Sequence, residues 1–386
     1  MNIHDDPVVI VSGVRTAIGR FGGSLKDVEA AELGAVCIRE ALRRAAMEPA
    51  DVDEVVMGQV GGVGPDAVNA RRCALAAGLP TTSTAMNVNR ACSSGVQAIA
   101  TGVQEILTGQ ADVVVAGGNE SMSRQPFLEF GRREGWKLGH HKVVDGTLSL
   151  VTCAFGGYPM GVTGENVAER YGVSREEQDR FALRSQELAA AAIERGDFDA
   201  EIVPVGDFAR DEHPRATTLE KLASLKPAFK ENGTVTAGNA TGVNDGAAAV
   251  VLLRRSEAER RGLTPRLALT AWAVTGIEPE VMGYGPAQAI PRVLERAGLS
   301  LDDIDIIELN EAFAAQAVAV ARDAGLPPEK VNPFGGAIAL GHPIGATGAI
   351  LTVKLMHALE RTGARRGIVT LCIGGGQGFA AVFERP

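Results

Sequence analysis

Aromatic residues are scarce in this chain, making up 4% of its 386 residues, with two tryptophans and three tyrosines. Glycine is abundant instead, at 47 residues. A core with few rings has to be filled by small aliphatic side chains and close backbone contacts. That requirement favours packed layers of helices and strands, so we expect an α/β protein.

Basic charge and long apolar runs are also lacking. The chain has 38 basic against 47 acidic residues, a net charge of −9, which gives no footprint for nucleic acid or an anionic membrane. No apolar run approaches the roughly 18 residues of a membrane span. The first residues, MNIHDDPVVI, lack the basic-then-apolar plan of a secretory signal. We expect a cytoplasmic protein with no membrane span and no nucleic-acid partner.

Paired cysteines are missing as well. The five cysteines contain no CxxC pair, so free thiols in a reducing compartment are expected. Cys37 and Cys73 lie in apolar helical stripes and are interpreted as core residues. Cys92 and Cys372 are each flanked by small residues, which makes them candidates for chemistry.

The chain repeats itself at an offset of about 250 residues, a sign of a duplicated unit. Three separate pairs of segments give nearly the same offset: ALRRAAMEPADVDEVVMG with VLERAGLSLDDIDIIELN, CSSGVQAIATGVQEIL with GATGAILTVKLMHAL, and ADVVVAGG with RGIVTLCIGG.

Each copy is predicted to fold as βαβαβαββ, because apolar strands alternate with amphipathic helices. This order predicts a mostly parallel sheet with helices on its faces. The expected strands are 8–12, 55–58, 85–88, 113–117 and 248–253 in the first copy, and 267–273, 304–309, a short one near 331, 367–373 and 378–383 in the second. The expected helices are 32–46, 69–77, 94–108, 287–297, 312–324 and 345–362.

About 130 residues between the two last strands of the first copy have no counterpart in the second copy. They include one clear helix, begun by a Ser174 cap with Glu177 in the capping-box position. We interpret this segment as an inserted lid that contributes substrate contacts rather than core. The predicted domains are residues 1–118 with 248–262, the lid 119–247, and residues 263–386.

The stretch NRACSSG places Cys92 after an expected strand and at the mouth of the next helix. Unpaired N–H groups and the helix dipole there favour a thiolate and lower a cysteine pKa. The same N–H groups could bind an oxyanion. The plain alternative is a buried small residue.

The second copy carries His342 in the equivalent turn, FGGAIALGHPIGATG, and Cys372 at the end of its next strand, TLCIGGGQG. Matching strand ends of the two copies should meet, so Cys92, His342 and Cys372 are expected in one cleft. A cysteine with a histidine is the pair that nucleophilic catalysis requires. Their spacing matches no usual zinc pattern, and no metal is expected. Asn310 either caps the helix that follows it or orients a water or carbonyl oxygen.

These motifs in this order resemble the thiolase family, the acyl-CoA C-acetyltransferases that make or cleave 3-oxoacyl-CoA. The resemblance spans nearly the whole chain and includes RTAIGRFGGSL, NRACSSG, GGNESMS, TVTAGNATGVNDGAAA, LNEAFAAQ, GHPIGATG and CIGGGQGFA. It implies a fold of two βαβαβαββ halves in five layers, α-β-α-β-α, with the lid inserted. The family's N-x-x-C-x-S-G cysteine falls on Cys92, its GHPxG histidine on His342 and its CxGGGxG cysteine on Cys372.

The resemblance also implies a mechanism. His342 would deprotonate Cys92, which attacks the substrate carbonyl and becomes acylated, while Cys372 exchanges a proton with the methyl carbon of acetyl-CoA. One oxyanion hole would use His342 and a water on Asn310, and a second the backbone N–H groups of Cys92 and Gly374.

Coenzyme A and acyl-CoA enter as substrates in this resemblance, with no tightly bound cofactor, and a homodimer or homotetramer is implied. Met160 and Thr241 would face the pantetheine arm, with threonine at 241 where the family commonly has serine. Basic residues gather in the lid of this acidic chain, and Arg215 is our candidate neighbour of the nucleotide. The full basic set is Arg210, Arg215, Lys221, Lys226 and Lys230.

Two other functions stay open at this point. One is a condensing enzyme that acts on acyl carrier protein, which the TAGNATG and CIGGG motifs disfavour. The other is a non-catalytic acyl-CoA-binding protein of the same family, which would be expected to lose part of the Cys92, His342 and Cys372 set.

Overall fold

The two copies of the repeat are joined through a single sheet in the computed structural model, which describes residues 6–386. The strand order is β11-β12-β13-β10-β1-β9-β5-β3-β4, with β2 beside β9 and β8 beside β1. The halves meet where β1 pairs with β10, Val9 opposite Ala268 and Ile10 opposite Leu267. The strands are β1 Val8–Thr16, β2 Gly19–Arg20, β3 Glu54–Gly58, β4 Thr84–Val88, β5 Val113–Ser121, β6 Phe127–Leu128, β7 Val144–Asp145, β8 Ile202–Val203, β9 Asn244–Arg254, β10 Leu267–Gly276, β11 Ile306–Leu309, β12 Arg366–Ile373 and β13 Gln377–Glu384.

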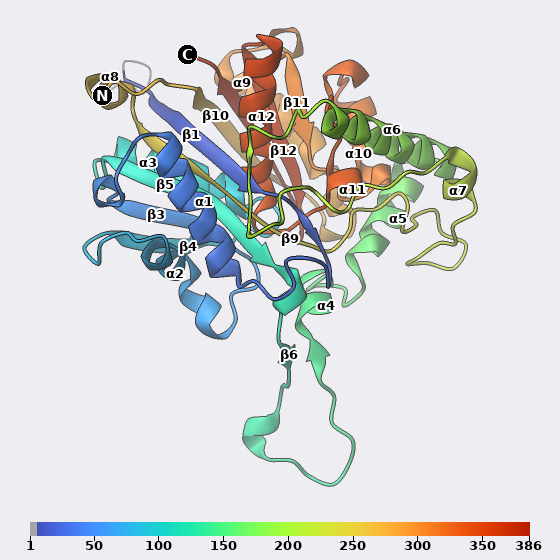
Figure 1. The fold of residues 1–386 in the computed structure, drawn as a ribbon. Coiled ribbons are helices and arrows are strands. Elements are labelled where there is room, and N and C mark those ends of the chain that lie inside the picture. Colours follow the sequence, from blue (N-terminus) through green and yellow to red (C-terminus); the bar gives the residue numbers. More distant parts are fainter. Residues whose placement is uncertain (1–5) are drawn as a thin grey trace.

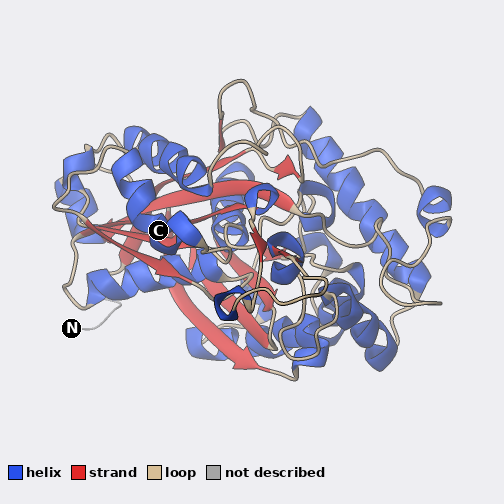
Figure 2. Cartoon of the chain, turned by 90° about the horizontal axis from the view of Figure 1, so that it is seen from below, coloured by secondary structure: helices blue, strands red, loops and turns tan. Residues whose placement is uncertain are grey.

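Helices lie on both sides of the strands and between the halves (Figure 2). Helices α1 and α2 pack on the outer face of the first half, and α9 and α10 on the outer face of the second. Helices α3 and α12 fill the middle layer and contact both each other and the strands on either side. This arrangement confirms the expected five layers. The helices are α1 Ala30–Arg44, α2 Asn69–Ala76, α3 Ser94–Leu107, α4 Gly146–Leu150, α5 Met160–Tyr171, α6 Arg175–Glu194, α7 Leu219–Ala223, α8 Arg255–Arg260, α9 Gly285–Ala297, α10 Ala314–Asp323, α11 Ala337–Leu340 and α12 Thr347–Thr362.

The prediction of a mostly parallel sheet is wrong. Strand β9 runs antiparallel to β1 and β5, and β13 runs antiparallel to β10 and β12. Parallel pairs occur where helices connect the strands, as in β3 with β4 and β5 and in β11 with β12. Strands β9 and β13 are the last strands of the two copies, and no helix packed on the sheet connects either one to the strand before it. Each therefore runs antiparallel to its neighbours. The short strand expected near residue 331 is reduced to one bridge between Ile307 and Val331.

The inserted segment contributes core, contrary to expectation. Ala189, Ala192 and Phe198 are buried within the largest apolar cluster, and β8 joins the sheet beside β1. The expected capping box is present, because the Glu177 N–H donates to Ser174 Oγ at 3.2 Å and the Ser174 N–H donates to Glu177 Oε2 at 2.7 Å. The part between β6 and β7 protrudes from the body as an arm (Figure 1). Strand β5 continues three residues past the expected border at 118, and the division into three domains stays a prediction.

No helix among residues 6–386 is long and apolar enough to cross a membrane. Three large apolar clusters thus fill the spaces between the helix layers and the two halves of the sheet. The turns that carry Cys92 and His342 lie just before the middle helices α3 and α12.

Candidate active site

Cys92 lies just outside a helix, on the turn between β4 and α3. Helix α3 begins at Ser94, and Ser93 is its N-cap. The turn is tight: Ala91 has a φ of 43°, and the Arg90 N–H donates to Ser94 Oγ at 2.9 Å. This conformation presents the Cys92 thiol ahead of the first helical turn, as the sequence predicted.

The expectation of a lowered pKa at Cys92 is wrong in the unliganded protein. Burial raises the pKa of this thiol, and hydrogen bonds from the backbone N–H groups of Gly374 and of Cys92 itself oppose that rise without cancelling it. The negative charge of Glu120 adds a smaller increase to the Cys92 pKa. Cys92 therefore rests as a neutral thiol that needs a base.

The first turns of α3 and α12 touch backbone to backbone, and that contact sets the two catalytic turns side by side. A Cβ at Gly95 would lie 2.6 Å from the backbone nitrogen of Ala349 and 3.0 Å from the carbonyl oxygen of Ala346. A Cβ at Gly348 would strike the backbone of Val96 in the same way. Because these five residues of the two helices are in direct contact, the turn before α3 and the turn before α12 converge.

His342 lies in the turn before α12, and we assign its ring proton to Nδ1 from its hydrogen-bond partners. Nδ1 lies 2.6 Å from the Thr347 hydroxyl, whose own proton is assigned to the carbonyl oxygen of Pro343 at 2.9 Å. The unprotonated Nε2 then faces the Asn310 amide, whose Nδ2 lies 3.4 Å away. Burial lowers the pKa of His342 to about 4, so the imidazole is neutral and Nε2 is free to accept a proton.

The backbone of this turn is held by the last strand of the first half. The His342 N–H donates to Asn244 Oδ1 at 2.9 Å, and Gly341 before it has a φ of 108°. A side chain at Gly341 would also run into the Asn244 amide. Asn244 thus fixes the direction in which the imidazole points.

Cys372, the third residue of the candidate site, lies near the end of β12. It is fully buried, and burial first, then the nearby charge of Cys92, raises the pKa of its thiol. The Gly374 N–H reaches the Cys92 sulfur, and a Cβ at Gly374 would lie 3.1 Å from Met160 Cε. The sulfurs of the two halves therefore share one environment, roofed by Met160 of the inserted segment. No group of three or more His, Cys, Asp or Glu side chains within residues 6–386 is arranged to hold a metal ion.

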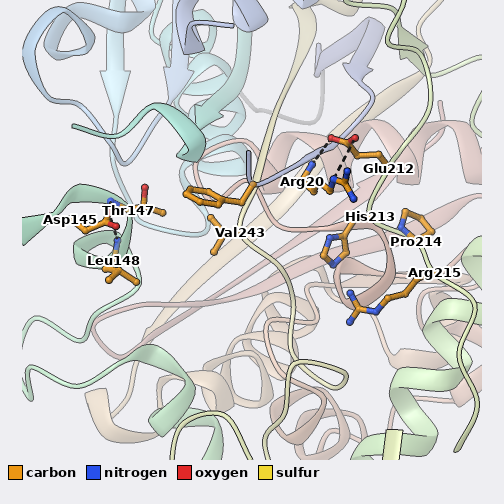
Figure 3. A pocket seen from close by; sticks show the side chains of 10 residues that line it. Arg20, Asp145, Thr147, Leu148, Glu212, His213, Pro214, Arg215 and Val243 are labelled. Carbon is orange, nitrogen blue, oxygen red and sulfur yellow. Dashed lines mark hydrogen bonds and ion pairs between the residues drawn. The ribbon is translucent and has the colours of Figure 1, made fainter. Parts of the chain in front are cut away.

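An open cavity of about 720 Å³ lies between the inserted segment and the first half. The residues at one side come from 212–215, those at the other from 145–148, and Val243 lies between them (Figure 3). Cys92, His342 and Cys372 are not part of this lining. The link is short, because Val243 precedes Asn244, which binds the backbone of His342. The cavity is therefore not the place where Cys92, His342 and Cys372 meet, and Asn244 connects its lining to the His342 turn.

Of the five basic residues singled out in the sequence, Arg215 lines this cavity and the other four do not. Arg215 Nη2 donates to the carbonyl oxygen of Ala237 at 2.7 Å, while Lys230 is paired with Glu169 at 3.0 Å. The sequence analysis missed Arg20, Phe21 and His213, which also line the cavity. Arg20 and Phe21 stand in the RTAIGRFGGSL motif, but only long-range folding reveals that they face Arg215.

The two residues expected at the pantetheine arm lie in different settings. Met160 begins α5 and packs against the apolar cluster that contains Cys372. The Thr241 hydroxyl donates to the carbonyl oxygen of Ala337 at 2.9 Å, so its proton is already engaged. Its oxygen retains a lone pair for a donor on a ligand.

Comparison with known families identifies the class of protein that this fold and site define. The family model "Thiolase, N-terminal domain" matches residues 8–256, and "Thiolase, C-terminal domain" matches residues 263–385. The chain belongs to the thiolase family and is an acyltransferase.

Individual relatives agree over the full length. The chain is 53% identical over 389 residues to beta-ketothiolase BktB of Cupriavidus necator, covering 98% of this chain and 99% of that protein. It is 50% identical over 388 residues to an acetyl-CoA acetyltransferase of Escherichia coli, covering 98% of both.

Solved structures match as well. The acetyl-CoA acetyltransferase of Bacillus anthracis superposes with a TM-score of 0.96 at 47% identity, and human mitochondrial 3-ketoacyl-CoA thiolase in complex with CoA with 0.96 at 42%, each covering 98% of both chains. These likenesses favour an acyl-CoA thiolase over the two alternatives left open by the sequence.

Proposed function

We propose that this chain cleaves 3-oxoacyl-CoA with coenzyme A to give acetyl-CoA and a shortened acyl-CoA, or runs the reverse condensation. The observation that carries the proposal is the backbone contact between the first turns of α3 and α12, which sets the turn of Cys92 beside the turn of His342. We place the thiols of Cys92 and Cys372 and the neutral imidazole of His342 together at this junction of the two halves. This set provides a nucleophile, a base and a second proton carrier.

In the first step His342 Nε2 takes the thiol proton as the Cys92 sulfur attacks the 3-oxo carbonyl. The Nδ1–H bond to Thr347 keeps Nε2 unprotonated until that moment. The oxyanion that develops on the attacked carbonyl is expected to be stabilised by the N–H groups of Cys92 and Gly374, with the thioester oxygen of the acetyl-CoA half at His342 and a water held by Asn310. Donors fixed in advance act on charge that exists only in the transition state.

In the second step the bond between the α and β carbons breaks and leaves Cys92 acylated. The departing acetyl-CoA carbanion takes a proton from the Cys372 thiol at its methyl carbon. Free coenzyme A then gives its thiol proton to the Cys372 thiolate and attacks the acyl-cysteine, which releases the shortened acyl-CoA. The Cys92 sulfur leaves as a thiolate and takes back the proton held by His342, so all three groups return to their starting states. The apolar surroundings of Cys372 keep its thiol protonated before this step, which supports its role as the acid.

Coenzyme A is expected to enter through the cavity of Figure 3, with the nucleotide near Arg215 and the pantetheine arm passing Thr241 and Met160. A structure of a related human mitochondrial enzyme is described as a complex with CoA, which supports this substrate class. The related structures are named for acetyl-CoA and for 3-ketoacyl-CoA, which supports coenzyme A thioesters as substrates. Specificity constants over a series of 3-oxoacyl-CoA lengths would rank the acyl chains.

The direct test is covalent capture of the acyl group. Incubation of the wild type with acetyl-CoA or acetoacetyl-CoA should leave an acetyl mass increment on the peptide that contains Cys92. Cys92→Ser should carry no such increment and should lose thiolysis of acetoacetyl-CoA. A wild type with neither turnover nor transfer for any 3-oxoacyl-CoA would replace this function by acyl-CoA binding alone.

The chain is further proposed to act as a homodimer or homotetramer in the cytoplasm. Large apolar side chains of the arm are exposed, Phe130 at 76% and Trp136 at 57%, which is unusual on a monomer surface. Light scattering of the full chain, compared with a variant whose arm residues 129–143 are replaced by a short Gly-Ser turn, would measure the assembly. The five cysteines are free in the folded chain, which suits a reducing compartment.

A further inference from the structure

Glu120 is a fully buried carboxylate for which the proposed reaction has no direct use. It lies near the end of β5, in the GGNESMS motif, and next to Gly345 in the His342 turn. A buried carboxylate is costly unless its oxygens are hydrogen-bonded, so its partners show what it does.

The carboxylate joins two backbone turns that belong to different halves. Glu120 Oε2 accepts from the N–H of Val60 at 2.9 Å and from the N–H of Gly345 at 2.9 Å, and Oε1 accepts from the N–H of Gly61 at 3.1 Å. Gly345 is three residues after His342, in the same turn. Any Cβ at Gly345 would meet this carboxylate and the backbone of Gln59, so the turn sits directly on it.

The same carboxylate acts on the nucleophile. Its negative charge is among the causes that raise the pKa of Cys92. Burial raises the pKa of Glu120 itself to about 7, the three N–H groups oppose the rise, and the charge of Asp66 adds to it. Asp66 is paired with Arg72 at 2.8 Å, which moderates its effect. The groups that contact Glu120 are thus three backbone N–H donors, while Asp66 and Cys92 interact with it through charge.

We infer that Glu120 is a positioning residue for the thiolase reaction, which holds the His342 turn against the first half through the hydrogen bond from the Gly345 N–H, and whose buried charge also acts on Cys92. This inference deepens the proposed function and rests on it. Glu120 touches neither substrate nor a reacting atom, and it acts through His342 and Cys92. The length of its side chain sets the position of the His342 turn, and its negative charge acts on the pKa of Cys92. Two variants, Glu120→Asp and Glu120→Gln, test these two effects.

Removal of the charge is tested by Glu120→Gln, with the rate of Cys92 alkylation by iodoacetamide followed against pH. We expect the midpoint to move down by about half a pH unit or more, because one buried negative charge near the thiol is lost. A merely structural role would slow the reaction without that downward move. Glu165→Gln is the matched control: Glu165 also holds backbone N–H groups, those of Thr234 and Val235, and its charge is not among the causes acting on Cys92.

Loss of reach is tested by Glu120→Asp, which keeps the charge but shortens the side chain. We expect an alkylation midpoint within about 0.2 pH units of the wild type, and a kcat for thiolysis lower by about tenfold with KM changed less than twofold, since a displaced base loses its alignment. An unmoved or raised midpoint in folded Glu120→Gln, or an unchanged kcat in Glu120→Asp, would overturn the inference. Alkylation needs no substrate, so the coupling of Glu120 to Cys92 is measured even if the wild type shows no turnover.

Discussion

Arg90 Nη1 donates a hydrogen bond of 3.1 Å to Gln377 Oε1 and thereby ties the turn of Cys92 to the strand that follows Gly374. Without this tie the Gly374 N–H would lose its fixed direction toward the sulfur. We predict that Arg90→Ala and Gln377→Ala each lower kcat by about tenfold, and that the double variant is little worse than either one. Steady-state kinetics of the four proteins would reveal the coupling, whereas fully additive losses would show that the bond plays no part.

The two sulfurs are expected to fail in different ways. Cys372→Ala should still transfer an acetyl group onto Cys92, as measured by mass spectrometry, because acylation from a simple thioester needs no proton on carbon. Its carbon–carbon cleavage and condensation should fall by about 10³-fold or more. Equal loss of both activities in Cys372→Ala would show that the sulfurs do not divide the work in this way.

Acid should destabilise the fold through its buried histidines. Burial lowers the pKa of His342 to about 4 from an ordinary value of 6.5, so between those values the unfolded chain binds a proton that the folded chain does not. The stability is therefore complete above pH 6.5 and is lost as the pH falls toward 4, by about 1.4 kcal/mol per pH unit for one such group. Burial lowers the pKa of His213 and His357 to about 4 too, which adds slope in the same direction.

Urea unfolding at pH 7 and pH 5 would measure this slope. His342→Asn should flatten it, and His140→Asn, which alters an exposed histidine of the arm, should not. The same slope in both variants would mean that His342 takes up its proton equally well in the folded chain.

The cavity residue Arg215 should matter for the nucleotide and not for the acyl group. We predict that Arg215→Ala raises KM for acetoacetyl-CoA by about five- to tenfold at low salt, with less effect at high salt, since an exposed cation is screened. Turnover of the N-acetylcysteamine thioester, which has no nucleotide, should be unchanged. Lys226→Ala removes the same charge outside the cavity and is the matched control. Equal effects of Arg215→Ala on both substrates would place the nucleotide elsewhere.

The contact between α3 and α12 should not tolerate a methyl group. In Gly95→Ala the new Cβ would lie 2.6 Å from the backbone nitrogen of Ala349, so a helix has to move, at a cost of about 1–3 kcal/mol. Gly276→Ala introduces the same methyl where nothing lies within 4 Å and should change stability by less than about 0.5 kcal/mol. Chemical denaturation compares the two; a Gly95→Ala variant as stable as Gly276→Ala would show that the helices slide apart freely.

The sequence predicted most helices and strands because their apolar spacing is a local property. Strand direction was missed at β9 and β13, since it depends on which strands pair across long distances. The repeat placed His342 in the turn that corresponds to the turn of Cys92, and the first turns of the two helices that follow are in contact. The pKa of Cys92 could not be predicted from the helix terminus alone, because burial outweighs the nearby N–H groups.

Other site features left no local mark in the sequence. Glu120 sits in an apolar strand and shows its role only through the backbone groups it meets. Arg20 is brought to the cavity when the backbone N–H of Arg20 donates to Glu212 Oε1, a contact between segments far apart along the chain.

Gly95 and Gly348 hold the catalytic turns at a spacing that only hydrogen atoms separate. Every larger residue at either position would meet the facing backbone at less than van der Waals distance and would push the turns of Cys92 and His342 apart. The two copies of the repeat could therefore diverge independently in their outer helices. In the shared middle layer, a larger side chain in α3 or α12 would require a compensating substitution in the other helix.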